Sequence, residues 1–158
     1  MTPAKEVNFE RTFDAPVETV WQAWTDPEKI KQWWGPEHVI IPECTIDLRV
    51  GGKLYIVMEA DEGMGPYKGT RWPMEGTYTE IEEDTRLAYT ATAWTEGHEE
   101  TTQIEQVAEL TLTNDNGKTK MTLKVTITKT GPDAGMAVEG MQMGYTQQFS
   151  KLEKYLQG

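Results

Sequence analysis

The sequence is poor in cysteine and in basic residues. Its single cysteine, Cys44, excludes a disulfide within the chain. Against 26 acidic residues it has only 15 basic ones, which gives a formal net charge of −11 at pH 7. Binders of nucleic acid or of anionic lipid concentrate lysine and arginine, so neither a nucleic acid nor a membrane is an expected partner. The acidic surface is interpreted as a source of solubility, with docking on a basic protein as the alternative.

Long apolar runs and cofactor motifs are also missing. No apolar stretch approaches the roughly 18 residues of a membrane span, and the first residues lack the pattern of a secretion signal. A soluble, cytoplasmic protein is therefore expected. The two histidines, His38 and His98, lie far apart in the sequence, which contains no HExxH or CxxC pair, no phosphate-binding glycine loop and no GxSxG elbow. No metal and no other cofactor is expected.

The first part of the chain predicts one strand and two short helices. Apolar and polar residues alternate over 6–13 (EVNFERTF), which is typical of a half-buried strand. The segment DAP at 14–16 predicts a helix start with Asp14 as its cap, and the DP pair at 26–27 repeats the signal. The GP pair at 35–36 ends the second helix.

From residue 43 the alternation is typical of an antiparallel sheet. A strand over 43–50, with its apolar residues at even positions, turns at the glycine pair 51–52. Polar loops are predicted at 61–69, which is interpreted as mobile, and at 95–102. The other predicted strands are 53–60, 74–81, 86–94, 104–113 and 118–129.

An amphipathic helix is predicted from the GPD segment at 131–133 to the C-terminus. Its apolar stripe consists of Val138, Met141, Tyr145, Phe149, Leu152 and Leu156. An antiparallel sheet needs one face covered, and no other long amphipathic element is available to cover it. The predicted fold is α+β, a single domain over 1–158 in which a curved sheet of about six to seven strands wraps on this helix. A cavity is expected between them.

Four segments of the chain together resemble a known superfamily. They are DAPVETVWQAWTDPEKIKQWWGP, IDLRVGGKLYIVM, MEGTYTEIEEDTRLAYT and GYTQQFSKLEKYL. In this order they resemble the SRPBCC/START-like superfamily, and within it the group related to the C-terminal domain of the activator of the ninety-kilodalton heat-shock protein ATPase. The matching positions are Trp33, Trp34, Gly35, Pro36, Asp47, Arg49, Gly51, Gly52, Gly76, Gly144, Tyr145, Phe149 and Leu152.

The resemblance implies a helix-grip fold of the START/Bet v type. The superfamily includes lipid and hormone carriers, polyketide cyclases and stress proteins, so the matching positions carry over the fold rather than a chemistry. Tyr145 and Phe149 depart from the tryptophan and leucine of the family pattern. Because the co-chaperone has a further N-terminal domain, for which this chain has no room, ATPase activation is not expected to carry over.

Six tryptophans and eight methionines are many for 158 residues. Both residue types suit the lining of an apolar ligand site. Trp34 is also expected near the mouth of the cavity, and Met143 is placed at the same interface of sheet and helix. The predicted ligand-binding residues are Trp34, Leu54, Met58, Met74, Trp94, Met141 and Tyr145.

Three hypotheses about function follow from these observations. The first is binding of a small hydrophobic or amphipathic molecule by a monomer or weak homodimer. The second is an accessory protein that interacts with a chaperone or acts in a stress response. The third, ranked last, is a cofactor-free cyclase or hydrolase, for which no catalytic residue is assigned. Such an enzyme needs a buried carboxylate, and the candidates are Glu59, Glu75, Glu109 and Glu139, each interpreted instead as part of a wet face.

Overall fold

The computed structural model describes residues 5–157, so residues 1–4 and 158 of the predicted domain lie outside it. The strands are β1 (Lys5–Phe13), β2 (Val39–Ile46), β3 (Lys53–Ala60), β4 (Arg71–Glu82), β5 (Arg86–Ala93), β6 (Ile104–Asp115) and β7 (Lys118–Thr130). The helices are α1 (Val17–Thr25), α2 (Pro27–Ile30), the 3₁₀ helix η1 (Glu62–Tyr67), α3 (Glu99–Thr102) and α4 (Gly135–Leu156).

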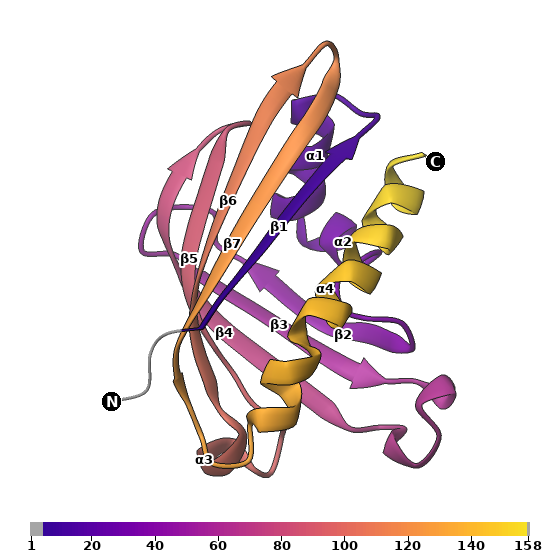
Figure 1. The fold of residues 1–158 in the computed structure, drawn as a ribbon, viewed down its shortest axis with the longest axis vertical. Helices are drawn as coiled ribbons and strands as arrows, with labels where there is room; N and C mark the ends of the chain where they lie inside the picture. The colour runs from indigo at the N-terminus through magenta and orange to yellow at the C-terminus, as the bar shows by residue number, and fades with distance from the viewer. Residues whose placement is uncertain (1–4, 158) are drawn as a thin grey trace.

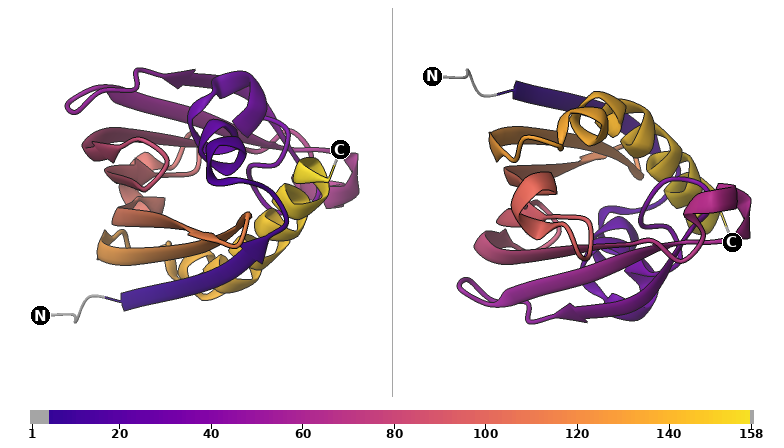
Figure 2. Two further views of the ribbon diagram at one scale, coloured as in Figure 1. Left: turned by 90° about the horizontal axis from the view of Figure 1, so that it is seen from above. Right: turned by 90° about the horizontal axis from the view of Figure 1, so that it is seen from below.

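All seven strands form one antiparallel sheet in the order β1-β7-β6-β5-β4-β3-β2. From β2 to β7 each strand pairs with the next one along the chain, whereas β1 pairs with β7. The sheet is strongly curved, and α1, α2 and α4 lie on its inner side (Figures 1 and 2). The predicted α+β fold, with its curved sheet, two short helices and long C-terminal helix, is confirmed.

Two details of the predicted elements are wrong near the β2–β3 hairpin. The strand β2 begins at Val39 and ends at Ile46, while Leu48 and Val50 are exposed. The chain turns after β2, where Asp47 and Arg49 form a 2.8 Å ion pair and Gly51 takes a φ of +85°. The alternation of apolar and polar residues therefore continues past the end of β2, where the apolar residues are no longer buried.

The two helix starts differ in how well the sequence predicted them. Asp26 caps α2 as expected, because its Oδ1 accepts the Glu28 backbone N–H at 2.9 Å. Asp14 does not cap α1. The cap position is Pro16, whose carbonyl accepts the N–H of Val20, and Asp14 lies two residues too early to reach the free amides of the helix.

The two predicted loops contain short helices. The segment 61–69 includes η1, whose first amides are satisfied by Asp61, and the segment 95–102 ends in α3. The loop over 61–69 thus contains two hydrogen-bonded turns, separated by a kink at Gly65 with a φ of +59°, which its glycine and proline content did not predict.

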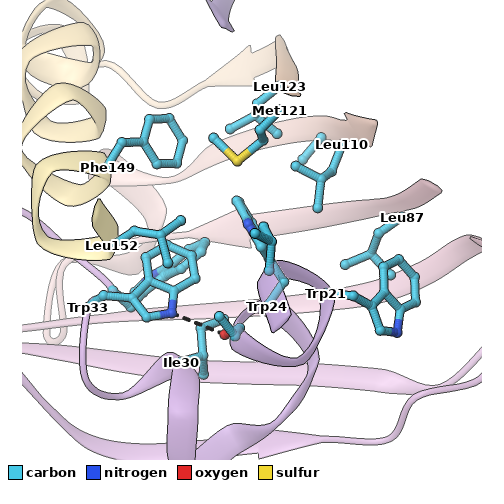
Figure 3. Packing of buried hydrophobic residues seen from close by; sticks show 14 of the residues in the cluster. Trp21, Trp24, Ile30, Trp33, Leu87, Leu110, Met121, Leu123, Phe149 and Leu152 are labelled. Carbon is cyan, nitrogen blue, oxygen red and sulfur yellow. Dashed lines mark hydrogen bonds between the residues drawn. The ribbon is translucent and has the colours of Figure 1, made fainter. Parts of the chain in front are cut away.

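Tryptophans of α1 and of the segment that follows α2 pack together in the core on the concave face of the sheet. Trp24 and Trp33 are almost wholly buried, with ring centroids 5.0 Å apart. Figure 3 shows Trp21 and Trp24 facing Leu87 and Leu110 of the sheet. The indole N–H of Trp33 donates to the carbonyl of Ala23 at 3.0 Å, the dashed line in Figure 3, and so satisfies one of the last carbonyls of α1.

The C-terminal half of α4 is fastened to the segment that follows α2. The carbonyl Oε1 of Gln148 accepts the N–H of Gly35 at 2.9 Å. The ammonium of Lys151 donates to the carbonyls of Trp34, Gly35 and Pro36 at 3.2, 3.2 and 3.4 Å. We call these contacts the α4 clasp. They satisfy backbone groups that no helix or strand partner reaches.

Candidate ligand-binding site

Packing along α4 is uneven. Phe149 and Leu152, on the half that carries the clasp, are fully buried. On the N-terminal half, Val138, Met141 and Tyr145 face the sheet but are only partly buried. The half of α4 that lies over the lower part of the concave face in Figure 1 therefore covers it with side chains that remain partly exposed to solvent.

Small side chains line the middle of the concave face on β4, β5 and β6. Across the sheet, Gly76 on β4 is paired with Ala91 on β5, and Ala91 with Gln106 on β6. Ala93 and Ala108 occupy further inward positions on β5 and β6. We call Met74, Tyr89, Ala91, Ala93 and Gln106, with Met141 and Tyr145 of α4, the inner cluster.

Gln106 and Met74 meet over the middle strand of the inner cluster. The amide Nε2 of Gln106 on β6 lies 3.8 Å from the sulfur of Met74 on β4. The strand β5 runs between them, and neighbouring strands are about 4.8 Å apart. Both side chains must therefore extend over β5, which is possible because Ala91 and Ala93 stop at a methyl group.

The inner cluster is polar in places but carries no formal charge. Burial raises the pKa of Tyr145 to about 12. Burial, with smaller electrostatic contributions from Tyr145 and Tyr78, also raises the pKa of Tyr89 well above its usual value. Both phenols are therefore neutral at physiological pH, and the cluster presents hydroxyl, amide and thioether groups in apolar surroundings.

The predicted ligand-binding residues do not all lie together. Leu54 and Met74 belong to the buried core, with Met58, Met141 and Tyr145 packed against it. Trp34 is buried in the aromatic cluster with Trp24 and Trp33, and its carbonyl accepts Lys151 of the clasp.

Two residues assigned to the sheet–helix interface differ from the others. Trp94 follows the end of β5, is half-buried, and donates its backbone N–H to Pro73, while Ala93 before it packs on the core. Met143 was placed at the interface wrongly, because it is 68% exposed on the outer side of α4. A position two residues from Met141 lies about 200° around a helix from it.

Sequence reasoning did not find Gln106, Tyr89, Gln148 or Lys151. Gln106 had a usable signal, because it interrupts the inward series Ile104, Ala108, Leu110 and Leu112 on β6. A polar residue in the apolar register of a strand is a candidate for a polar contact inside the fold. The clasp residues had no such signal, since their partners are backbone groups more than 100 positions away.

The four candidate carboxylates lie outside the inner cluster. Glu59 pairs with Arg71 at 2.8 Å, and Glu109 pairs with Arg86 at 3.1 Å. Glu75 and Glu139 are exposed. Both histidines are exposed as well, and His38 lies 3.7 Å from Asp61. Within residues 5–157 no group of three potential metal ligands comes together.

Cys44 provides a first test of the inner face of β2. Burial raises the pKa of its thiol from 9.0 to about 11. At pH 8 its thiolate fraction is about a hundredfold lower than that of an ordinary cysteine, and only the thiolate reacts. We expect iodoacetamide to modify Cys44 about a hundredfold more slowly in the folded protein than in 6 M urea, measured by mass spectrometry. Equal rates in the folded and unfolded protein would mean that folding neither shields the thiol nor raises its pKa.

Two hollows open on the surface away from the inner cluster. One, of about 240 Å³, lies beside the end of α4 and is lined by Phe13, Lys118 and Glu153 among others. The second, of about 410 Å³, lies on the outer face of the sheet, with Asn8, Glu109 and Lys124 in its lining. Both linings include charged side chains, unlike the inner cluster.

The curved antiparallel sheet wrapped on a C-terminal helix places this chain in the class of SRPBCC-type helix-grip proteins. Residues 14–157 match the family described as "Activator of Hsp90 ATPase homolog 1-like protein", and the chain belongs to that family. A comparison with curated proteins found no match. None of the helices within residues 5–157 combines the length and the apolarity needed to cross a membrane.

Solved structures of bacterial proteins share the fold over nearly the whole chain. A Nitrosomonas europaea protein is 26% identical, with a TM-score of 0.75 and coverage of 96% of this chain and 94% of its own. A Chromobacterium violaceum protein is 20% identical, with a TM-score of 0.77 and 97% coverage of both chains. An Arthrobacter aurescens protein is 24% identical, with a TM-score of 0.75 and coverage of 96% and 86%.

Proposed function

We propose that this protein binds a small, neutral, largely apolar molecule between its sheet and the N-terminal half of α4. The observation that carries the proposal is the uneven packing of α4 over an uncharged inner cluster. The residues in the centre of the sheet are small, so the side chains that cover this region come from α4. These are Met141, Tyr145 and Val138, which are only partly buried. A ligand can replace such contacts without disrupting the well-packed aromatic core.

Access to the inner cluster requires movement of α4. Met74, Tyr89 and Gln106 are all buried, so a ligand reaches them only when the covering side chains are displaced. The clasp holds the C-terminal half of the helix and Ala134 packs under its start, which leaves the turns between them as the part able to move. Binding then follows selection of a more open state of the helix.

Charge placed under α4 tests this proposal directly. We expect Met141→Lys to weaken binding of the neutral fluorescent probe N-phenyl-1-naphthylamine by at least about tenfold, because a buried ammonium is strongly disfavoured next to an apolar ligand. The matched control is Met143→Lys, two residues along the same helix on its exposed side. Its affinity should equal that of the wild type. Equal affinities for both variants, or no saturable binding to the wild type, would contradict the proposal.

A second candidate is an accessory role with a chaperone, which the description of the family favours. It relies on surface contacts rather than on the inner cluster. If the probe fails to bind the wild type while the protein stimulates the ATPase of an Hsp90-type chaperone, this second function is the better account.

A further inference from the structure

Gln106 is placed where a structural role does not account for it. It is 6% exposed, and its carbonyl Oε1 has no hydrogen-bond partner among the described residues. Its Nε2 has only the weak acceptor sulfur of Met74 at 3.8 Å. Burying an amide oxygen without a partner destabilises a fold, and buried acceptors are therefore usually paired.

The other buried glutamine provides a comparison. Gln148 also has one unpaired group, its Nε2, but its Oε1 holds the N–H of Gly35 in the clasp. That contact gives Gln148 a reason to be buried in the free protein. Gln106 makes no comparable bond, although a leucine or methionine would fit the apolar pattern of β6 at that position.

The location of the Gln106 amide points toward a ligand. Its side chain extends across β5 over the methyl groups of Ala91 and Ala93, and Ile104, two residues before it on β6, belongs to the small cluster against which Val138 and Met141 of α4 pack. A molecule held between the sheet and Met141 or Tyr145 would lie against this amide. An oxygen acceptor with no partner there matches a ligand that donates a hydrogen bond.

We propose that Gln106 Oε1 selects ligands that carry a hydroxyl or N–H donor on an otherwise apolar, neutral body, such as a phenol or an aromatic alcohol. This rests on the proposed function, because it assigns the polar contact of the same site. Sites with a buried acceptor discriminate well against analogues that lack the donor, because the acceptor would then remain unpaired. A carboxylate or phosphate does not fit, since the inner cluster offers no positive charge to an anion.

The experiment compares three probes of similar shape: 2-naphthol, 2-methoxynaphthalene and naphthalene. Their affinities are measured by competition with N-phenyl-1-naphthylamine for the wild type, Gln106→Leu and the control Gln142→Leu, whose site is exposed on α4. We expect the wild type and the control to prefer 2-naphthol over 2-methoxynaphthalene, and Gln106→Leu to reduce this preference by about fivefold to tenfold. Gln106→Met serves as a second variant of similar volume.

Stability of the free variants separates this role from a structural one. A residue kept for its ligand contact is dispensable without ligand, so Gln106→Leu should resist urea at least as well as the wild type. Marked destabilisation of both Gln106 variants would overturn the assignment. It would also be overturned if both variants still preferred 2-naphthol as strongly as the wild type does, or if the wild type preferred 2-methoxynaphthalene, which can only accept a hydrogen bond. If every probe binds the wild type without preference, only this inference fails. If none binds, the proposed function fails with it.

Discussion

Replacing Trp33 with alanine is expected to destabilise the protein by about 3–5 kcal/mol, the usual range for a large aromatic residue removed from a core. Its side chain is fully buried between Trp24 and Trp34. The change also leaves the carbonyl of Ala23 without its 3.0 Å partner at the end of α1. With a urea dependence of about 1–3 kcal/mol per M for a domain of this size, the unfolding midpoint should fall by roughly 2 M.

Two variants control for the general effect of losing a tryptophan. Trp94→Ala removes a half-buried indole outside the aromatic cluster and should lower the free energy of unfolding clearly less than Trp33→Ala does. Trp33→Phe retains a ring but loses the N–H, so it isolates the contribution of the hydrogen bond to Ala23, about 1–3 kcal/mol. A midpoint for Trp33→Ala equal to that of Trp94→Ala would show that the aromatic cluster is not the main source of stability.

The second large effect is expected at Lys151. Lys151→Met keeps most of the aliphatic stem but removes an ammonium that donates to three backbone carbonyls. Hydrogen bonds from a charged donor are stronger than neutral ones, and their loss leaves the carbonyls of Trp34 and Gly35 without a partner. We expect a loss of about 2–3 kcal/mol in urea unfolding.

The same helix contains a matched control for this change. Lys154 lies three residues later and is exposed, so Lys154→Met should change stability by no more than about 0.5 kcal/mol. Burial lowers the pKa of Lys151, yet its position against three acceptors requires the charged form. Equal stability of the two variants would mean that water satisfies the carbonyls when the ammonium is absent.

Strands were predicted best where burial and alternation coincide. β7 has an inward series of Thr119, Met121, Leu123, Val125 and Ile127, all buried, and its predicted limits differ from the observed ones by one residue. Leu48 and Val50 continue the same alternation of apolar and polar residues, but they lie in an exposed turn and not in a strand. Alternation of apolar and polar residues predicts which face of the sheet each residue would lie on if a strand forms. It does not by itself show that a strand is present.

The candidate site was predictable only in part. Met74, Met141 and Tyr145 were placed at the interface of sheet and helix, because apolar residues on a sheet and on its covering helix must face each other, and all three pack there. Gln106 was not found, although it interrupts the apolar inward series of β6, because the sequence does not show which side chains lie beside it across the sheet. The role proposed for it depends on Ala91 of β5 and Met74 of β4, which strand pairing brings beside it from distant parts of the chain.

The pairing of β1 with β7 has a consequence for the order in which the chain folds. From β2 to β7 the sheet grows by hairpins between consecutive strands, each closing a short loop. β1 cannot join by that route, because Lys5 pairs with Ile127 and Phe13 with Thr119. Closing so long a loop costs entropy before any contact offsets it. During synthesis β1 therefore lacks its partner strand until β7 and the strands between them have also been made.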